Sequence, residues 1–216
     1  SKKLALTEIL LTHHHPDHVG GVKELKDAFP ACQIFGPDTP RFKPFTTGLK
    51  PGQSITLKAT NTSFDVIDLS GHTCDHIGFI DTNNAFVGDT LFSIGCGRLF
   101  EGTAEQMFNS LNKLKGLKDN ISVYCAHEYT LANIEFASAV EPNNPALLEY
   151  QQSVKSGLAQ GQGSIPTNIK REKALNPFLR VDQKIIKLTL QQKFQLKELP
   201  TEVESFALLR QWKDKF

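Results

Sequence analysis

Four of the seven histidines of this chain fall within residues 13–18, in the segment Thr12-His13-His14-His15-Pro16-Asp17-His18. The segment follows the apolar run 9–11, which has the pattern of a buried strand, and precedes a helical periodicity that begins at residue 20. Residues two apart in an extended segment point to the same side, so the first and third histidines converge and the second points away. The segment therefore predicts a cluster of ligands where a strand ends.

The ligand types in this segment indicate a metal site. Asp17 and His18 follow a proline that redirects the chain, and they add a second pair of ligands to His13 and His15. Imidazole and carboxylate ligands suit zinc, iron or manganese, and ligands offered in two groups favour two ions over one. The alternatives to a metal site are an ordinary polar loop and a histidine tag left from purification. Both are disfavoured, because the run is embedded between a strand and a helix and is interrupted by Pro-Asp.

Further candidate ligands stand just past the ends of other predicted strands. His72 follows the strand predicted over 64–69, and Asp89 and His127 follow strands that end at Val87 and Cys125. Sites in α/β proteins are commonly built at such strand ends. A carboxylate has two oxygens, so Asp89 is the natural bridge between two cations.

The hydrophobic pattern divides the chain into an α/β region over residues 1–127 and a helical region over residues 128–216 that packs on it. Strands are predicted over 9–11, 33–36, 55–57, 64–69, 77–81, 85–87 and 121–125, with a loop over 37–51. Helices are predicted over 20–29, 103–115, 131–140, 145–160 and 203–213. Almost no strand signal follows Tyr129, and no internal repeat is present.

Composition excludes several classes of protein. With 24 Lys+Arg against 23 Asp+Glu, the net charge of +1 gives no support to a strongly basic nucleic-acid binder. No apolar stretch approaches the roughly 20 residues that span a bilayer. The 4 cysteines show no CxxC spacing, so they are interpreted as apolar fillers in a reducing compartment. We expect a cytoplasmic monomer that binds neither nucleic acid nor membrane.

Several runs of the sequence carry a family resemblance: THHHPDHVGG, GHT, GDTLF and AHEYT resemble the metallo-β-lactamase superfamily. Within it, GDTLFSIGCGRLFEGTAEQM (88–107), NPFLRV (176–181) and the final stretch around Arg210 and Lys213 resemble the hydroxyacylglutathione hydrolases, or glyoxalase II. The resemblance runs from about residue 9 to the end. It implies an αββα sandwich with a C-terminal helical region. It also implies hydrolysis of S-D-lactoylglutathione to D-lactate and glutathione, the second step of methylglyoxal detoxification.

The resemblance also implies which residues bind two divalent metal ions, with zinc as the first candidate and iron or manganese as alternatives. His13, His15 and His72 hold one ion, Asp17, His18 and His127 hold the other, and Asp89 bridges them. Paired cations lower the pKa of a water between them, so hydroxide is the expected nucleophile. Asp89 and this bridging hydroxide form the expected catalytic unit. A thiolate leaves readily, so thioester hydrolysis does not require a strong proton donor at the leaving group.

By the same resemblance Arg98, Tyr129, Arg210 and Lys213 bind the substrate, because glutathione carries two carboxylates. From the residues alone, Arg98 lies in a loop just after Asp89, whereas the basic pair of the last helix would be interpreted as a solvated face. Relatives often have tyrosine where this chain has Phe100, so one hydroxyl contact is expected to be missing.

Three further features depart from the family or are left over. His14 is expected to make a hydrogen bond rather than a metal bond, and His76 to be an interior histidine. Asp75 stands where relatives usually have glycine, and it is not expected to be a ligand. The resemblance also implies strands before Leu10, so we expect either a piece of a longer protein or a shortened one, with a sheet edge uncovered.

Other activities remain as alternatives. A persulfide dioxygenase or another thioesterase uses the same scaffold, but the dioxygenase usually binds a single iron. A β-lactam hydrolase leaves the helical region unexplained, and a tRNA-processing nuclease needs a basic arm that the charge balance does not support. A non-catalytic metal-dependent scaffold is disfavoured, because a two-ion site with an open position is costly to maintain for structure alone.

Overall fold

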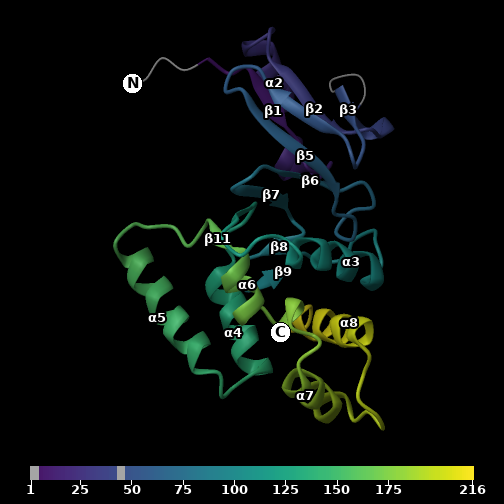
Figure 1. The fold of residues 1–216 in the computed structure, drawn as a ribbon, viewed down its shortest axis with the longest axis vertical. Coiled ribbons are helices and arrows are strands. Elements are labelled where there is room, and N and C mark those ends of the chain that lie inside the picture. The colour runs from purple at the N-terminus through teal and green to yellow at the C-terminus, as the bar shows by residue number, and fades with distance from the viewer. Residues whose placement is uncertain (1–4, 43–46) are drawn as a thin grey trace.

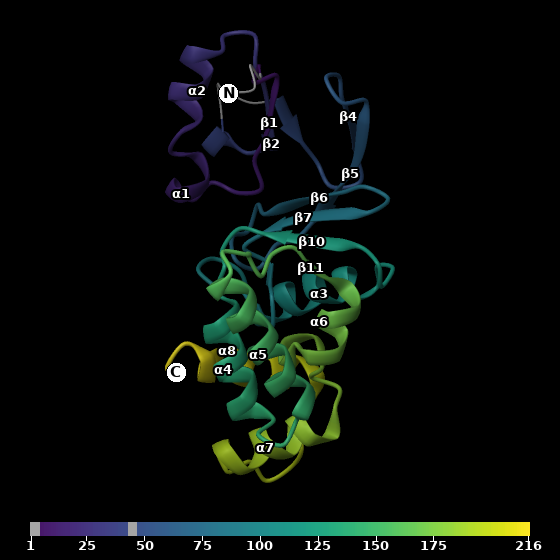
Figure 2. The ribbon, with the colours of Figure 1, turned by 90° about the vertical axis from the view of Figure 1, so that its left-hand side faces the viewer.

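The computed structural model of the chain describes residues 5–42 and 47–216. Its first sheet has three parallel strands in the order β1-β2-β3. The helices α1 and α2 connect β1 to β2 and cover this sheet (Figure 2). The bounds are β1 (Glu8–Leu10), α1 (Pro16–Val19), α2 (Val22–Ala28), β2 (Gln33–Pro37), η1 (Pro40–Phe42) and β3 (Thr47–Leu49).

The second sheet has six strands in the order β11-β10-β7-β6-β5-β4. Its pairs are antiparallel except β10 with β7, which is parallel. A two-stranded ribbon of β8 and β9 follows β7 in the chain. The bounds are β4 (Ser54–Leu57), β5 (Thr62–Asp68), β6 (Ile77–Ile80), β7 (Asn84–Gly88), β8 (Leu91–Phe92), β9 (Gly95–Cys96), β10 (Ser122–Cys125) and β11 (Thr167–Asn168).

Helices form the remaining layer. Helix α3 (Ala104–Lys115) packs beside the six-stranded sheet, and the C-terminal helices lie beyond it (Figure 1). Figure 2 shows α1 and α2 beside the first sheet, β4 and β5 on the other side of that sheet, and α3 and the C-terminal helices below the strands β7, β10 and β11. This is the αββα sandwich with a helical region that the sequence predicts. The bounds are α4 (Thr130–Val140), α5 (Pro145–Ala159), α6 (Ile169–Leu175), η2 (Pro177–Leu179), α7 (Lys184–Phe194) and α8 (Glu202–Lys213).

The main hydrophobic core lies between the six-stranded sheet, α3 and the C-terminal helices. Helix α3 begins with a capping box between Thr103 and Gln106, and its buried face presents Met107, Leu111 and Leu114 at helical spacing. Phe178 and Phe206 from the C-terminal region are buried in the same cluster. The two regions therefore share one core, which holds α8 in a fixed place relative to the sheet.

The predicted elements occur with ends within two residues of the predicted positions, but the sequence pattern missed several others. The missed helices are α1, α6 and α7, and the missed strands are β3, β8, β9 and β11. The missed strands have only two or three residues, too few for an alternation to be visible. The expected absence of strands after Tyr129 is corrected by β11, which pairs with β10. Within the expected loop 37–51, residues 43–46 lie outside the described residues.

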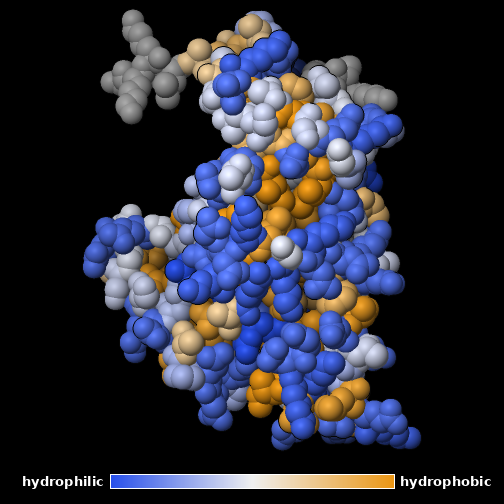
Figure 3. Space-filling view, viewed as in Figure 1, coloured by the Kyte–Doolittle hydropathy of each residue, from blue (hydrophilic) through white to orange (hydrophobic). Residues whose placement is uncertain are grey.

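An apolar hollow of about 430 Å³ opens between the two sheets. Its lining includes Leu10, Leu57, Phe64, Phe86 and Tyr124. The apolar surface at the level of β5 to β7 is visible in Figure 3. Among the described strands, β1 and β3 are the edges of the first sheet, and β4 and β11 are the edges of the second. None of the described helices combines the length and apolar content that crossing a bilayer requires.

Candidate metal centre and substrate cavity

Three of the predicted ligands lie at one edge of the six-stranded sheet. Strands β5, β7 and β10 run in the same direction, so their carboxyl ends meet there. His72, Asp89 and His127 each follow one of these ends. Gly71 and Gly88 precede two of them with φ of +144° and +49°. A Cβ at either glycine would come within 2.7 Å of its neighbours, so both turns require glycine.

The histidine-rich segment approaches the same edge from the first sheet. The carbonyl of Thr12 accepts a hydrogen bond from the amide of Ile77 at 2.9 Å, which ties the segment to β6. His15 is the N-terminal cap residue of α1, and Pro16 occupies its first turn, where a missing amide proton costs nothing. Asp17 therefore lies in the first turn of α1, beside the ligands of the sheet.

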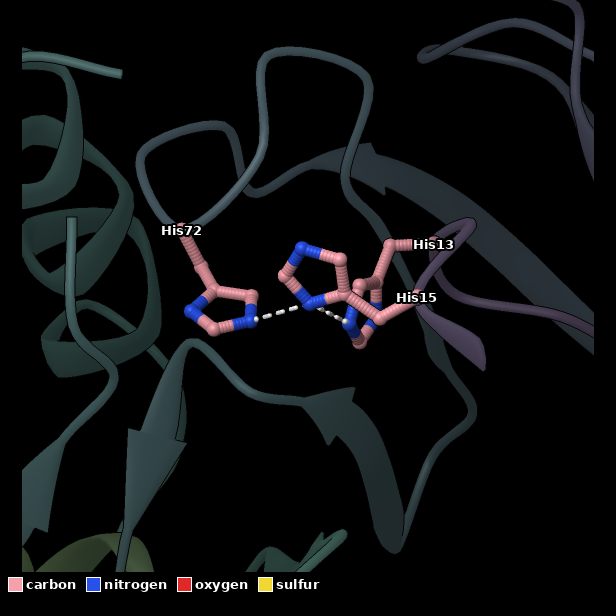
Figure 4. Close-up of side chains that lie close together, drawn as sticks. All are labelled: His13, His15 and His72. Carbon is pink, nitrogen blue, oxygen red and sulfur yellow. Dashed lines mark hydrogen bonds between the residues drawn. The ribbon is translucent and has the colours of Figure 1, made fainter. Parts of the chain in front are cut away.

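His13, His15 and His72 form one group of candidate ligands. His15 Nδ1 lies 3.2 Å from His13 Nε2 and 2.9 Å from His72 Nε2. Figure 4 shows the three rings directing these nitrogens toward one another. Nitrogens that share a tetrahedral zinc ion with Zn–N bonds near 2.0–2.1 Å lie about 3.3 Å apart. The spacing of this group fits one small cation.

Asp17, His18 and His127 form a second group. Asp17 Oδ2 lies 3.5 Å from His18 Nε2 and 3.3 Å from His127 Nε2. Asp89 stands between the groups, with Oδ1 3.2 Å from His18 Nε2 and Oδ2 3.5 Å from both His72 Nε2 and His127 Nε2. The structure thus brings all seven predicted ligands together, with the carboxylate of Asp89 between the two groups.

The electrostatics of this cluster favour forms that bind cations. Burial lowers the pKa values of His13 and His72, which keeps their imidazoles neutral. Burial alone would raise the pKa of Asp89, but the adjacent imidazole of His18 outweighs it, so the pKa of Asp89 is lowered. The adjacent carboxylate of Asp89 raises the pKa of His18 in return. Although only 3.2 Å apart, His18 Nε2 and Asp89 Oδ1 are buried without a well-oriented hydrogen bond. These residues fit a metal centre.

Neighbouring groups orient the candidate ligands. The carbonyl of Arg98 accepts a hydrogen bond from His72 Nδ1 at 2.8 Å, which leaves Nε2 for the cluster. His76 is fully buried and stacks on His13 with ring centroids 4.6 Å apart. Its Nε2 accepts the amide proton of Asp89 at 3.1 Å, as suits the expected interior histidine. His76 therefore fixes the backbone that carries the central carboxylate.

A cavity of about 750 Å³ opens beside the cluster. Ligand-cluster residues in its wall include His15, Asp17, His72, Asp89 and His127, and all four predicted substrate residues also line it: Arg98, Tyr129, Arg210 and Lys213. The ring of Tyr129 stacks on His127, with centroids 5.0 Å apart. Phe100 is 63% exposed and lies edge-on to His15 and His72 in the same wall.

The four predicted substrate residues differ in their exposure and in the contacts that they already make within the protein. The side chain of Arg98 is 65% exposed and lies 3.6 Å from Asp214. Lys213 is half-buried, and its Nζ donates to the carbonyl of Ala132 at 3.2 Å. Arg210 is only 5% exposed and donates to the carbonyl of Cys96 at 2.9 Å. Its guanidinium is therefore engaged within the protein and not on the solvated face that the residues alone suggest, whereas the substrate role implied by the resemblance stays a prediction.

Asp214 is a charged residue of the cavity wall that the sequence reasoning did not single out. It lines the cavity and pairs with Arg210, four residues earlier on α8. This i, i+4 spacing of opposite charges was a usable signal. Cys32, Cys96 and Cys125 are buried, in agreement with the expected filler role, and burial raises the pKa values of Cys96 and Cys125 to about 11. Cys74 is exposed, so for this cysteine the filler prediction is wrong.

Together the αββα sandwich and the seven-residue cluster at its strand ends define a member of the metallo-β-lactamase superfamily. The family model described as "Metallo-beta-lactamase superfamily" matches residues 2–127. The model described as "Hydroxyacylglutathione hydrolase C-terminus" matches residues 128–216. The chain belongs to the hydroxyacylglutathione hydrolase family, as its sequence motifs predict.

Similar proteins agree with this assignment. A hydroxyacylglutathione hydrolase of Aliivibrio salmonicida is 48% identical over 99% of this chain and 82% of its own length. The crystal structure of ETHE1 from Myxococcus xanthus has a TM-score of 0.62 over 98% of this chain and 79% of that chain, at 22% identity, and so shares the fold. A protein solved in a di-iron-bound form is 25% identical, with a TM-score of 0.54 over 82% of this chain and 78% of its own.

Proposed function

We propose that this chain hydrolyses the thioester bond of S-D-lactoylglutathione, releasing D-lactate and glutathione in the second step of methylglyoxal detoxification. The observation that carries the proposal is the shared cavity, whose wall holds both the ligand cluster and the cationic residues of the helical region. The names of the 47–48% identical relatives support the same reaction.

The candidate cofactor is a pair of divalent cations. His13, His15 and His72 would hold one ion, Asp17, His18 and His127 the other, and Asp89 would bridge them. Zinc is the first candidate for this donor set, with iron or manganese as alternatives. When bound, such a pair supplies Lewis acidity and lowers the pKa of water toward neutrality. Dependence on metal is supported by the ligand groups themselves.

The chain's own residues supply orientation and charge. Asp89, with oxygens facing both ligand groups, orients the attacking water and accepts its hydrogen bond. Tyr129 stands over His127 and is 49% exposed, so its hydroxyl can meet the glutathione chain at the mouth of the cavity. Arg98 and Lys213 offer positive charge to the two carboxylates of glutathione. Arg210 positions this wall by holding the Cys96 carbonyl and Asp214.

We further propose a division of labour between the two regions. Residues 1–127 carry the metal ligands and Arg98, whereas residues 128–216 supply Tyr129 and Lys213 for substrate binding and Arg210 to position the wall. The absence of a charge excess supports a small-molecule substrate rather than a nucleic acid. A cytoplasmic monomer is the form that we propose for this activity.

Thioester turnover, combined with elemental analysis, tests the proposal. The purified protein should hydrolyse S-D-lactoylglutathione, lose this activity with a chelator, and regain it when zinc, iron or manganese is returned. Two metal equivalents per chain should accompany full activity. A glutathione persulfide and a β-lactam serve as comparison substrates. Faster turnover of either one, or thioester hydrolysis that survives complete metal removal, would contradict the proposal.

A further inference from the structure

Asp75 is a nearly buried carboxylate behind the histidine-rich segment. Its side chain is 12% exposed, and it accepts hydrogen bonds from the hydroxyls of Thr73 at 2.9 Å and Thr39 at 3.3 Å. His14 Nδ1 lies 3.2 Å from its Oδ1 and donates to it. The carboxylate therefore ties the histidine-rich segment to the turn after β5 and to the segment that follows β2.

Arg41 and Glu101 complete this arrangement around His14. Arg41 NH1 lies 2.7 Å from His14 Nε2, which accepts its proton, and 2.7 Å from Glu101 Oε1. Glu101 Oε2 accepts the amide proton of Cys74 at 3.0 Å. We call the four side chains of Asp75, His14, Arg41 and Glu101 the outer network. The Arg41 side chain is 48% exposed, and its guanidinium pairs with both carboxylates of the network, at 2.7 Å from Glu101 Oε1 and 3.9 Å from Asp75 Oδ2.

The outer network lies on the backbone that carries the first ligand group. His14 stands between His13 and His15, and Asp75 and Cys74 follow His72 in one tight turn. Both segments that must meet to form the three-histidine group are thus linked from behind by the same hydrogen bonds. Asp75 is not a wall of the substrate cavity, so its effect must pass through the ligands.

We propose that Asp75 is a positioning residue for the metal centre: through His14, Arg41 and Glu101 it holds His13 and His15 against His72. The ordering of two loops is then complete before a cation arrives, so binding has less conformational entropy to overcome. Groups that orient metal ligands in this way typically change metal affinity by about 10–100-fold when they are removed. This inference rests on the metal role proposed above for the three histidines.

The test compares Asp75→Ala with the control variant Asp119→Ala. The carboxylate of Asp119 lies 2.8 Å from Lys173 Nζ, and this ion pair lies outside the ligand cluster. Zinc release to a chromophoric chelator is measured on both loaded variants and on the parent. Asp75→Ala should bind one of its zinc ions about 10–100-fold more weakly and release it faster, whereas Asp119→Ala should match the parent. The cobalt-loaded Asp75→Ala should also show a shifted d–d absorption band, because the imidazoles are less well held.

A second pair of variants keeps the test decisive if Asp75→Ala does not fold. Asp75→Asn keeps an oxygen that accepts from His14, so it should lose less zinc affinity than Asp75→Ala. The double variant Asp75→Asn with Arg41→Gln should lose no more zinc affinity than the more strongly affected of its two single variants. Zinc affinity and cobalt spectrum that match the parent in the Asp75 variants would overturn the inference. So would a lowered melting temperature of the metal-free protein with unchanged zinc release. A parent that binds no metal would instead refute the proposed function.

Discussion

Asp214 Oδ1 lies 2.9 Å from the NH2 nitrogen and 3.1 Å from the Nε of Arg210. The same oxygen lies 3.6 Å from Nε of Arg98. A carboxylate of the chain itself therefore stands between Arg98, which is proposed to meet a substrate carboxylate, and Arg210, which is proposed to position the cavity wall. Because Arg98 is the exposed partner, a substrate carboxylate competes with Asp214 for Arg98.

Replacing Asp214 with asparagine should therefore lower KM for S-D-lactoylglutathione. The amide still accepts from Arg210, but it no longer offers a charge to Arg98. Exposed ion pairs are worth about 0.2–1 kcal/mol, so we expect KM to fall by a factor of about 1.4 to 5 with kcat unchanged. Steady-state kinetics measure both constants.

Asp182→Asn is the matched control for this variant. Its carboxylate has 40% exposure against 41% for Asp214 and pairs with Lys115 at 3.5 Å, outside the cavity wall. The control should have the kinetics of the parent. A raised KM in Asp214→Asn would mean that the carboxylate holds Arg210 in place for substrate rather than competing with it.

Lys213 should contribute to binding and not to the chemical step. Burial and the neighbouring Arg210 lower the pKa of Lys213, so an anionic partner such as a substrate carboxylate would stabilise its charged form. The ammonium lies over the rings of Phe136 and Phe216, 5.3 and 5.6 Å from their centroids, and methionine replaces it with an uncharged side chain of similar length. A charged hydrogen bond is worth about 1.5–3 kcal/mol, so Lys213→Met should raise KM about tenfold or more with kcat nearly constant.

Lys215→Met is the control, because Lys215 is exposed two residues further along the chain. It removes the same charge from the last stretch of sequence and should leave KM unchanged. A fall in kcat at constant KM in Lys213→Met would argue against a role in holding a carboxylate.

The clustering of the seven candidate ligands was predictable because its signals are local. His72, Asp89 and His127 each stand just past an apolar strand, and the ends of parallel strands converge at one sheet edge. The period-two pattern therefore located His72, Asp89 and His127 together with the histidine-rich segment. The helices with strong caps and long apolar faces, such as α3 and α8, were found for the same reason.

What the sequence could not supply are contacts between distant segments. Arg41 reaches Glu101 across 60 residues, and neither shows a pattern that names the other. The burial of Arg210 depends on how α8 docks on the main core, which brings its guanidinium to the carbonyl of Cys96. Periodicity predicts which face a helix buries, but it does not predict which polar side chains that face carries inward.

Asp89→Asn tests the bridge between the ligand groups. The amide nitrogen cannot accept a hydrogen bond or bind a cation. The variant therefore has one acceptor oxygen where Asp89 has two, Oδ1 facing His18 and Oδ2 facing His127. We expect less than two metal equivalents per chain by elemental analysis and a fall in kcat of at least about 10²-fold. Full metal content with full turnover would refute the two-metal arrangement, and restoration of activity by excess zinc would assign the loss to affinity.

Glu172 provides a pH-dependent contribution to stability far from the ligand cluster. Its carboxylate is fully buried and accepts from the amide of Ile94 and the side chain of Asn176, both at 2.9 Å, and from Thr167 at 2.7 Å. Ile94 has φ of +59° in the turn between β8 and β9, so Glu172 holds a strained turn next to Asp89's segment. Burial raises the pKa of Glu172 to about 7, although these hydrogen bonds lower it in part.

The stability difference between the parent and Glu172→Gln should therefore depend on pH. A carboxyl whose folded pKa lies above its unfolded value stabilises the fold most when protonated, so its contribution is full below about pH 4.5 and falls as pH rises through about 7. A shift from about 4.5 to about 7 corresponds to about 3 kcal/mol, since one pKa unit is worth about 1.4 kcal/mol. Urea unfolding of the metal-free proteins at pH 5 and pH 8 measures it. The parent should lose stability relative to Glu172→Gln between these pH values, and a constant difference would show that Glu172 does not titrate as its burial requires.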